Sequence, residues 1–69
     1  MKFDVYGRFI VEVIRRGEDW EVFLVEQGGR LRMNEVAIPS ETPMDRIPYY
    51  LEDLWHESAS RGKAIRRLD

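Results

Sequence analysis

The sequence FIVEVIRRGEDWEVFLVEQGGRLRM, residues 9–33, alternates apolar and polar side chains and is interrupted by two glycine-containing turns. Alternation with a period of two, in β-branched and aromatic residues, is typical of strands that bury one face. Turns centred on Gly17–Glu18 and Gly28–Gly29 would fold this stretch back on itself twice. The stretch therefore predicts an antiparallel meander of three strands.

The two turns also predict which residues pair across the strands. Val13 is expected opposite Val22, Val11 opposite Leu24, and Leu24 opposite Met33. This register gathers the large apolar side chains on one face, namely Phe9, Val11, Val13, Trp20, Val22, Leu24, Leu31 and Met33. A slip of one residue would scatter these side chains over both faces, so the pattern itself supports the register.

The alternation continues on both sides of the meander. It begins at about residue 2, and Gly7 is interpreted as a bend or bulge within a single first strand. Beyond Met33, a bulge near Asn34–Glu35 would return Val36 and Ile38 to the apolar face and allow a fourth strand. We therefore expect a sheet of three to four strands over about residues 2–38.

A helix is expected over about residues 45–61, after a connection that contains prolines. Asp45 is the predicted N-cap, Pro48 would then occupy the third helical position, and Gly62 would end the helix. At 100° per residue one stripe collects Ile47, Tyr50, Leu51, Leu54, Trp55 and Ser58. The predicted fold class is α+β, with this C-terminal amphipathic helix packed on one face of the sheet (β-β-β-α).

The charges are distributed unevenly along the chain. Residues 41–60 carry one basic and five acidic side chains, whereas residues 61–69 carry four basic and one acidic. The segment 62–69 is therefore a basic tail. Its pattern fits either a frayed end or an edge strand over residues 63–68, and it leaves both alternatives open.

Length and composition limit the classes of protein to which the chain can belong. Its 69 residues suffice for one small domain, 1–69, and the absence of cysteine excludes disulfides and thiolate metal sites. Charged residues interrupt the first ten positions, and no run of about 18 apolar residues occurs, so neither a signal peptide nor a membrane span is expected. We expect a cytoplasmic protein that does not contact a membrane.

The single histidine, His56, is the most conspicuous candidate for chemistry. It shares the outward side of the predicted helix with Glu52 and Asp53, which could hydrogen-bond to it. The sequence HESAS lacks the second histidine of a zinc-protease motif, adjacent carboxylates diverge on a helix, and no serine has a basic partner at a recognisable spacing. We therefore predict no catalytic residue, no metal site and no cofactor, and a protein that is not an enzyme.

The face of the sheet opposite the helix, termed the second face, is the more informative surface. The register places several large apolar side chains there, among charged ones, where a solvated sheet face would be polar. An apolar patch of this kind usually marks an interface. The predicted interaction surface consists of Tyr6, Arg8, Ile10, Ile14, Phe23, Val25 and Arg32.

Three interpretations of the second face compete. It could bind a second copy or another protein, which would supply apolar contacts that so short a chain lacks. It could instead be covered by the tail or by the proline-containing connection. It could also bind single-stranded nucleic acid by stacking bases on Tyr6 and Phe23 beside arginines, although the acidic balance of the chain opposes this. We expect a non-enzymatic protein-interaction domain, as a homodimer.

Four segments together, FDVYGRFIVEV, the tryptophan after the charged turn, IPSETP and YLEDLWHE, resemble those of a family of short uncharacterised bacterial proteins. The resemblance spans nearly the whole chain and implies a bacterial, cytoplasmic origin and a small β-plus-α fold, without an activity or site residues. In outline, three strands followed by a helix are also similar to bacterial antitoxin domains that neutralise a partner. That similarity is one of fold alone, and it implies antitoxin-like partner neutralisation as an alternative function.

Overall fold

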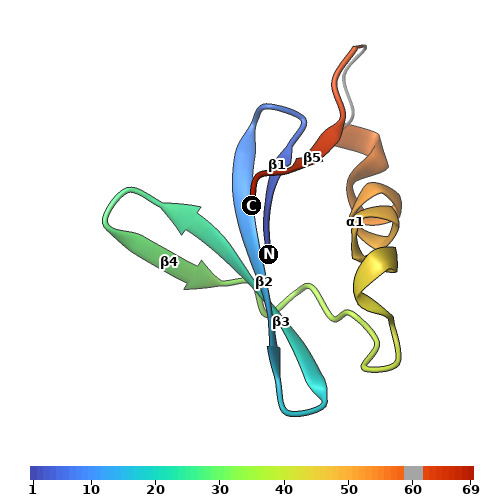
Figure 1. The fold of residues 1–69 in the computed structure, drawn as a ribbon. Coiled ribbons are helices and arrows are strands. Elements are labelled where there is room, and N and C mark those ends of the chain that lie inside the picture. The colour runs from blue at the N-terminus through green and yellow to red at the C-terminus, as the bar shows by residue number, and fades with distance from the viewer. Residues whose placement is uncertain (59–61) are drawn as a thin grey trace.

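The computed structural model describes residues 1–58 and 62–69, and within them the chain forms one five-stranded antiparallel sheet and one short α-helix (Figure 1). The α+β class is confirmed, but the sheet has five strands rather than three to four, and the helix is not C-terminal because a strand follows it. In spatial order β4-β3-β2-β1-β5, the strands are β1 (Lys2–Val5), β2 (Phe9–Arg16), β3 (Asp19–Glu26), β4 (Gly29–Arg32) and β5 (Ile65–Arg67).

The predicted first strand is in fact a hairpin. β1 and β2 pair with each other, and the Arg8 N–H donates to the Val5 carbonyl at 2.9 Å across the turn between them. Tyr6 (φ 55°) and Gly7 (φ 71°) are both left-handed there, as a type I′ turn requires. This turn directs the ring of Tyr6 into the core, so its predicted position on the second face is wrong.

The predicted register of the meander is correct for β2 and β3, where Val13 pairs with Val22 and Val11 with Leu24. Between β3 and β4 the turn lies one residue earlier than predicted, at residues 27–28, with Gly28 at φ 89°. Leu24 consequently pairs with Leu31 and not with Met33. Because the pairing shifts by two residues, every side chain keeps its face.

Strand β4 ends at Arg32, and no bulge near Asn34–Glu35 continues the sheet to residue 38. A turn over residues 34–35 follows instead, and Ile38 reaches the core from an irregular segment. This segment is fastened to the β2–β3 hairpin by side chains. Arg15 donates to the Ser40 carbonyl and Trp20 Nε1 to the Thr42 carbonyl, each at 2.9 Å.

The helix is shorter than predicted. A 3₁₀ turn, η1 (Met44–Arg46), precedes α1 (Ile47–Trp55), and a second 3₁₀ turn, η2 (His56–Ser58), follows it. Arg46, and not Asp45, is the N-cap, and Pro48 lies in the first turn of α1. The remainder of the predicted helix, residues 59–61, lies outside the described residues. No helix in the described part of the chain is long and apolar enough to cross a membrane.

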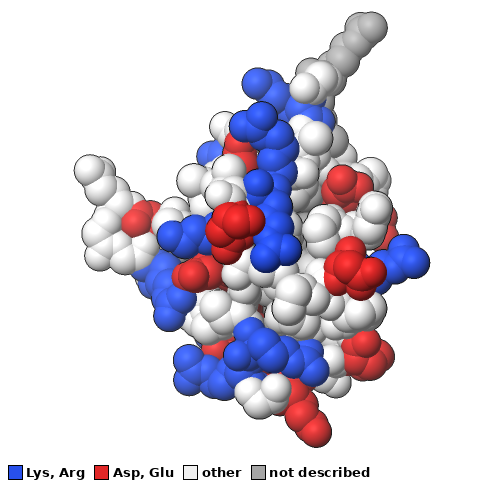
Figure 2. Space-filling model, in the orientation of Figure 1, with Lys and Arg blue, Asp and Glu red and all other residues white. Residues whose placement is uncertain are grey.

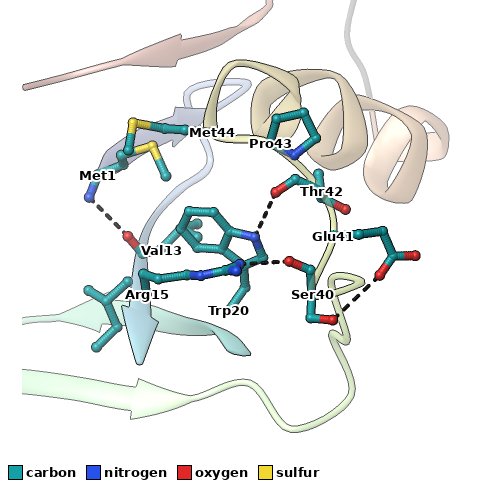
Figure 3. A pocket seen from close by; sticks show the side chains of 10 residues that line it. Met1, Val13, Arg15, Trp20, Ser40, Glu41, Thr42, Pro43 and Met44 are labelled. Carbon is teal, nitrogen blue, oxygen red and sulfur yellow. Dashed lines mark hydrogen bonds between the residues drawn. The ribbon is translucent and has the colours of Figure 1, made fainter. Parts of the chain in front are cut away.

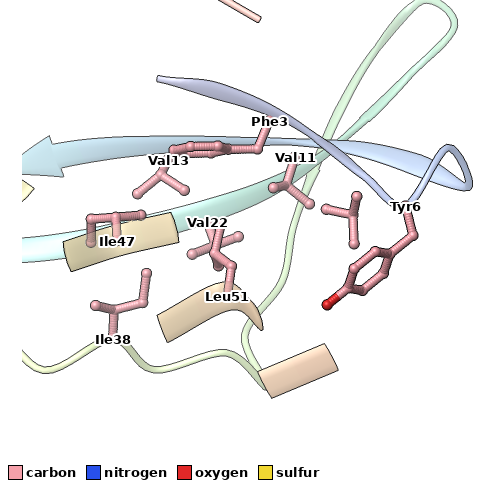
Figure 4. Close-up of a cluster of buried hydrophobic side chains, with 9 residues drawn as sticks. Phe3, Tyr6, Val11, Val13, Val22, Ile38, Ile47 and Leu51 are labelled. Carbon is pink, nitrogen blue, oxygen red and sulfur yellow. The ribbon is translucent and has the colours of Figure 1, made fainter. Parts of the chain in front are cut away.

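The core lies between the sheet and α1 (Figure 4). The predicted stripe supplies Ile47 and Leu51, both fully buried, while Tyr50 and Trp55 pack at its margin and Leu54 is 41% exposed. Leu54 is therefore wrongly assigned to the core by the sequence pattern. Among the residues whose burial the structure describes, the hydrophobic ones that are buried are Phe3, Val5, Tyr6, Val11, Val13, Val22, Ile38, Ile47 and Leu51.

The basic tail resolves as an edge strand, since β5 pairs with β1. The Leu68 N–H continues this ladder by donating to the Lys2 carbonyl at 2.8 Å. The Lys2 N–H donates to the carboxylate of Asp69, and this hydrogen bond is the main cause that lowers the pKa of that carboxyl group. The tail thus extends the sheet sideways and does not fold across the second face.

Candidate interaction surface

The second face keeps an apolar centre in the folded protein. Strand pairing places Ile10 between Asp4 and Val25, and Phe23 between Glu12 and Arg32. Ile10 is 36% exposed, and Ile14, Phe23 and Val25 are half-buried. Four apolar side chains of the predicted surface therefore lie on this face with part of their area open to solvent.

Part of this surface lines a shallow hollow of about 430 Å³. It is lined by Asp4, Gly7, Arg8, Phe9, Ile10, Val25 and Leu68. The structure thus brings together Arg8, Ile10 and Val25, as predicted, and adds Leu68, which is 49% exposed. The sequence of the tail could have indicated that Leu68 belongs to this surface. If residues 65–67 form a strand, residue 68 lies on the same face as Arg66, which is the second face.

The remaining predicted residues are not in this hollow. Phe23 lies beneath the guanidinium group of Arg30, whose Cζ is 4.4 Å from the ring centroid. Arg32 is engaged with a carboxylate, and Ile14 lies towards the other end of the sheet, at the rim of a separate groove. Tyr6, as described above, belongs to the core.

Three arginines of the second face are paired with carboxylates within the protein. Arg30 contacts Glu12, Arg66 Nη2 lies 4.0 Å from Asp4 Oδ2, and Arg32 Nη1 lies 3.0 Å from Glu21 Oε2. The face therefore presents an apolar centre bordered by these ion pairs.

Glu21 is the one buried charged residue among those described, at 7% exposure. Arg16 Nε lies 3.0 Å from Glu21 Oε1, but the angle does not satisfy a hydrogen bond, so this oxygen is held by charge alone. Since Arg32 holds the other oxygen, two arginines compensate a single buried carboxylate. This arrangement fastens the end of β4 to β3 and explains why a charge is tolerated there.

A larger hollow lies elsewhere, at the end of the β2–β3 hairpin (Figure 3). It is an open groove of about 630 Å³, lined by Met1, Val13, Ile14, Arg15, Trp20, Ser40, Glu41, Thr42, Pro43 and Met44. Its polar side chains have structural partners: Arg15 stacks on Trp20, with Cζ 4.6 Å from the ring centroid, and both bond to loop carbonyls. The hydroxyl group of Ser40 donates to Glu41 Oε2 at 3.4 Å, and both residues are exposed.

The surface of α1 is acidic. Residues 33–57 carry six carboxylates and a single arginine, and in Figure 2 red side chains outnumber blue ones on the side of the molecule that α1 forms. His56 is exposed here. Its Nδ1 lies 3.3 Å from the backbone carbonyl of Asp53, whereas the sequence suggested a contact with the side-chain carboxylate of Glu52 or Asp53. Within residues 1–58 and 62–69, no three His, Cys, Asp or Glu side chains come together as a metal site.

Comparison with known proteins identifies the family to which the chain belongs. No curated protein and no solved structure matches the chain. A family described as a domain of unknown function matches it over residues 1–69, which agrees with the short uncharacterised family that the sequence resembles. Because this match covers the whole chain, the protein belongs to the family DUF7661.

Proposed function

We propose that the protein is a non-enzymatic interaction domain that associates with a second copy of itself through the second face. The observation that carries the proposal is the partly exposed apolar centre of that face, formed by Ile10, Val25 and Leu68 with Phe23 beside it. Interfaces commonly combine an apolar centre with a polar rim whose charges are compensated. The second face has both features.

A second copy is favoured as the occupant because arginines beside the apolar centre are held by carboxylates of their own protomer. Arg30 is paired with Glu12 and Arg32 with Glu21, so these side chains need no carboxylate from the facing surface. The small core gives such an association a physical benefit. A chain of this length buries only about 60% of the surface that its unfolded form exposes, and a sheet-to-sheet contact adds apolar burial.

The nucleic-acid alternative loses its main supports. Of the two aromatic rings that would stack on bases, Tyr6 is buried in the core and Phe23 is covered by Arg30. Two of the arginines that would contact phosphates, Arg30 and Arg32, are held by Glu12 and Glu21. If the alternative were correct, the protein would bind single-stranded RNA, and the binding would weaken steeply with salt.

The experiment is a measurement of solution mass by light scattering on the wild-type protein, Ile10→Lys and a matched control, Leu54→Lys. Both residues are partly exposed, and each new lysine has a carboxylate nearby, Asp4 on the neighbouring strand and Glu57 on the next helical turn. We expect Ile10→Lys to halve the mass and Leu54→Lys to leave it unchanged. A wild-type protein that is monomeric at every concentration, or an unchanged mass for Ile10→Lys, would refute the proposal.

A further inference from the structure

A second surface, separate from the second face, is the outer edge of β4. In the described part of the chain, the backbone of β4 pairs with β3 alone, and all four of its residues are exposed (Figure 1). An edge strand presents unpaired N–H and C=O groups to any chain that can lie beside it. The position of α1 leaves β4 uncovered, because the helix contacts the sheet at β5, the edge strand farthest from β4 (Figure 1).

The pairing pattern identifies which backbone groups face outward. The Met33 N–H donates to the Val22 carbonyl, so residue 33 forms a hydrogen-bonded pair across β3 and β4. Hydrogen-bonded pairs alternate along an antiparallel ladder, which makes Leu31 the next such residue. The N–H and C=O groups of Arg30 and Arg32 therefore point away from the sheet.

Charged side chains usually protect such an edge, but here they turn away from it. The guanidinium group of Arg30 lies over Phe23 on β3 and contacts Glu12 on β2, two strands inward. Arg32 likewise reaches inward to Glu21 on β3. Both charges are thus neutralised and withdrawn, and the backbone edge between them stays open.

The other face of β4 carries Leu31, which is 58% exposed and pairs with the half-buried Leu24. The opposite edge of the sheet is less suited to pairing, since β5 has only three residues and α1 packs beside it. The open edge and the exposed leucine therefore coincide on one strand.

We propose that β4 pairs antiparallel with β4 of a second copy, about a twofold axis at Leu31, to form a continuous ten-stranded sheet. In this register Arg30 of each copy exchanges two backbone hydrogen bonds with Arg32 of the other. The two Leu31 residues form a non-hydrogen-bonded pair, whose Cα atoms lie about 4.5 Å apart with their side chains in contact. On the helix side, this contact completes a row of four leucines, Leu24 and Leu31 from each copy.

The edge pair uses a different surface from the second face, so the two associations are compatible. The twofold axis of the edge pair is perpendicular to the sheet, because both copies keep α1 on the same side. The two second faces then lie side by side, and two such dimers can stack through them. If the proposed function also holds, the assembly is a tetramer with twofold symmetry about three axes.

The test combines solution mass with amide hydrogen exchange. The single-chain mass is 8.2 kDa, and we expect the wild-type protein to have four times this value, Leu31→Lys and Ile10→Lys twice this value, and the double variant one chain mass. Lysine at residue 31 disrupts the edge because two ammonium groups would meet at the twofold axis, while its high exposure in the protomer makes the substitution harmless to folding.

Each outcome distinguishes the two associations. An unchanged mass for Leu31→Lys would overturn edge pairing and leave the second face intact, whereas an unchanged mass for Ile10→Lys would do the reverse. Amide exchange gives an independent reading: Arg30 and Arg32 should be protected in the wild-type protein and lose that protection in Leu31→Lys, while the Leu31 position stays protected in both. Rapid exchange at Arg30 and Arg32 in the wild-type assembly would also overturn the edge pair.

Discussion

Two leucines of α1, three residues apart, should differ sharply in what they contribute to stability. Leu51 is fully buried against the sheet, whereas Leu54 is 41% exposed. Truncating a fully buried leucine to alanine costs about 2–5 kcal/mol, because it loses the transfer energy and leaves a cavity. Truncating Leu54 should cost at most about 1 kcal/mol, since much of its surface is already in water and no closed cavity forms.

These magnitudes are large for so small a domain. At about 0.05–0.15 kcal/mol per residue, the whole protein should be stable by roughly 3–10 kcal/mol. Leu51→Ala should therefore lower Tm by roughly 10–30 °C, and Leu54→Ala by less than about 8 °C. The assay is urea and thermal unfolding followed by far-ultraviolet circular dichroism, at one fixed protomer concentration because association adds to apparent stability. Equal losses for the two variants would refute the placement of α1.

Three further predictions test the fold. Gly7→Ala should destabilise the protein by about 1–2 kcal/mol, because Gly7 has φ 71°. The control Gly29→Ala should change stability by less than about 0.5 kcal/mol, because Gly29 has no positive φ and open space around it. Equal effects of the two variants in chemical denaturation would contradict the turn assignment. Val11→Asp should unfold the protein, while Leu24→Asp should leave it folded, as read from amide spectra; an unfolded Leu24→Asp would place Leu24 in the core. Glu21→Gln should cost roughly 1–3 kcal/mol in urea unfolding because two arginines lose their common partner, and no loss would mean that this carboxylate is not structural.

Much of the sheet could be predicted because its alternation fixes faces unambiguously. The β2–β3 hairpin has apolar residues in phase on both strands and a glycine at its turn, so only one register buries them. The same argument identifies Ile10, Val25 and Phe23 as residues of the second face. Ile47 and Leu51 follow from helical spacing in the same way.

The prediction of the strands is wrong where two different structures would produce the same alternation of apolar and polar residues. Phe3, Val5 and Val11 point to one face whether residue 7 lies within a straight strand or in the loop of a hairpin, because the loop preserves the alternation. Moving the second turn by one residue shifts the pairing by two and again changes no face. Alternation therefore left both the β1–β2 hairpin and the position of the Gly28 turn undetermined.

The exposure of Leu31 and Leu54 has another cause. Periodicity assigns a side chain to a face or a stripe, but it does not say how far the opposing element extends. In the structure, α1 contacts the sheet at β5, the edge opposite β4. The β4 edge consequently became a candidate surface only once the position of the helix was known.

Self-association through the second face is tested most directly by contacts between protomers. Isotope-labelled protein is mixed with unlabelled protein. An isotope-filtered experiment then records only the nuclear Overhauser effects between a labelled protomer and an unlabelled one. We predict cross-protomer effects at the methyl groups of Ile10, Val25 and Leu68, which should vanish in Ile10→Lys. Cross-protomer effects confined to the exposed side of α1, at Leu54 and Tyr49, would contradict the account.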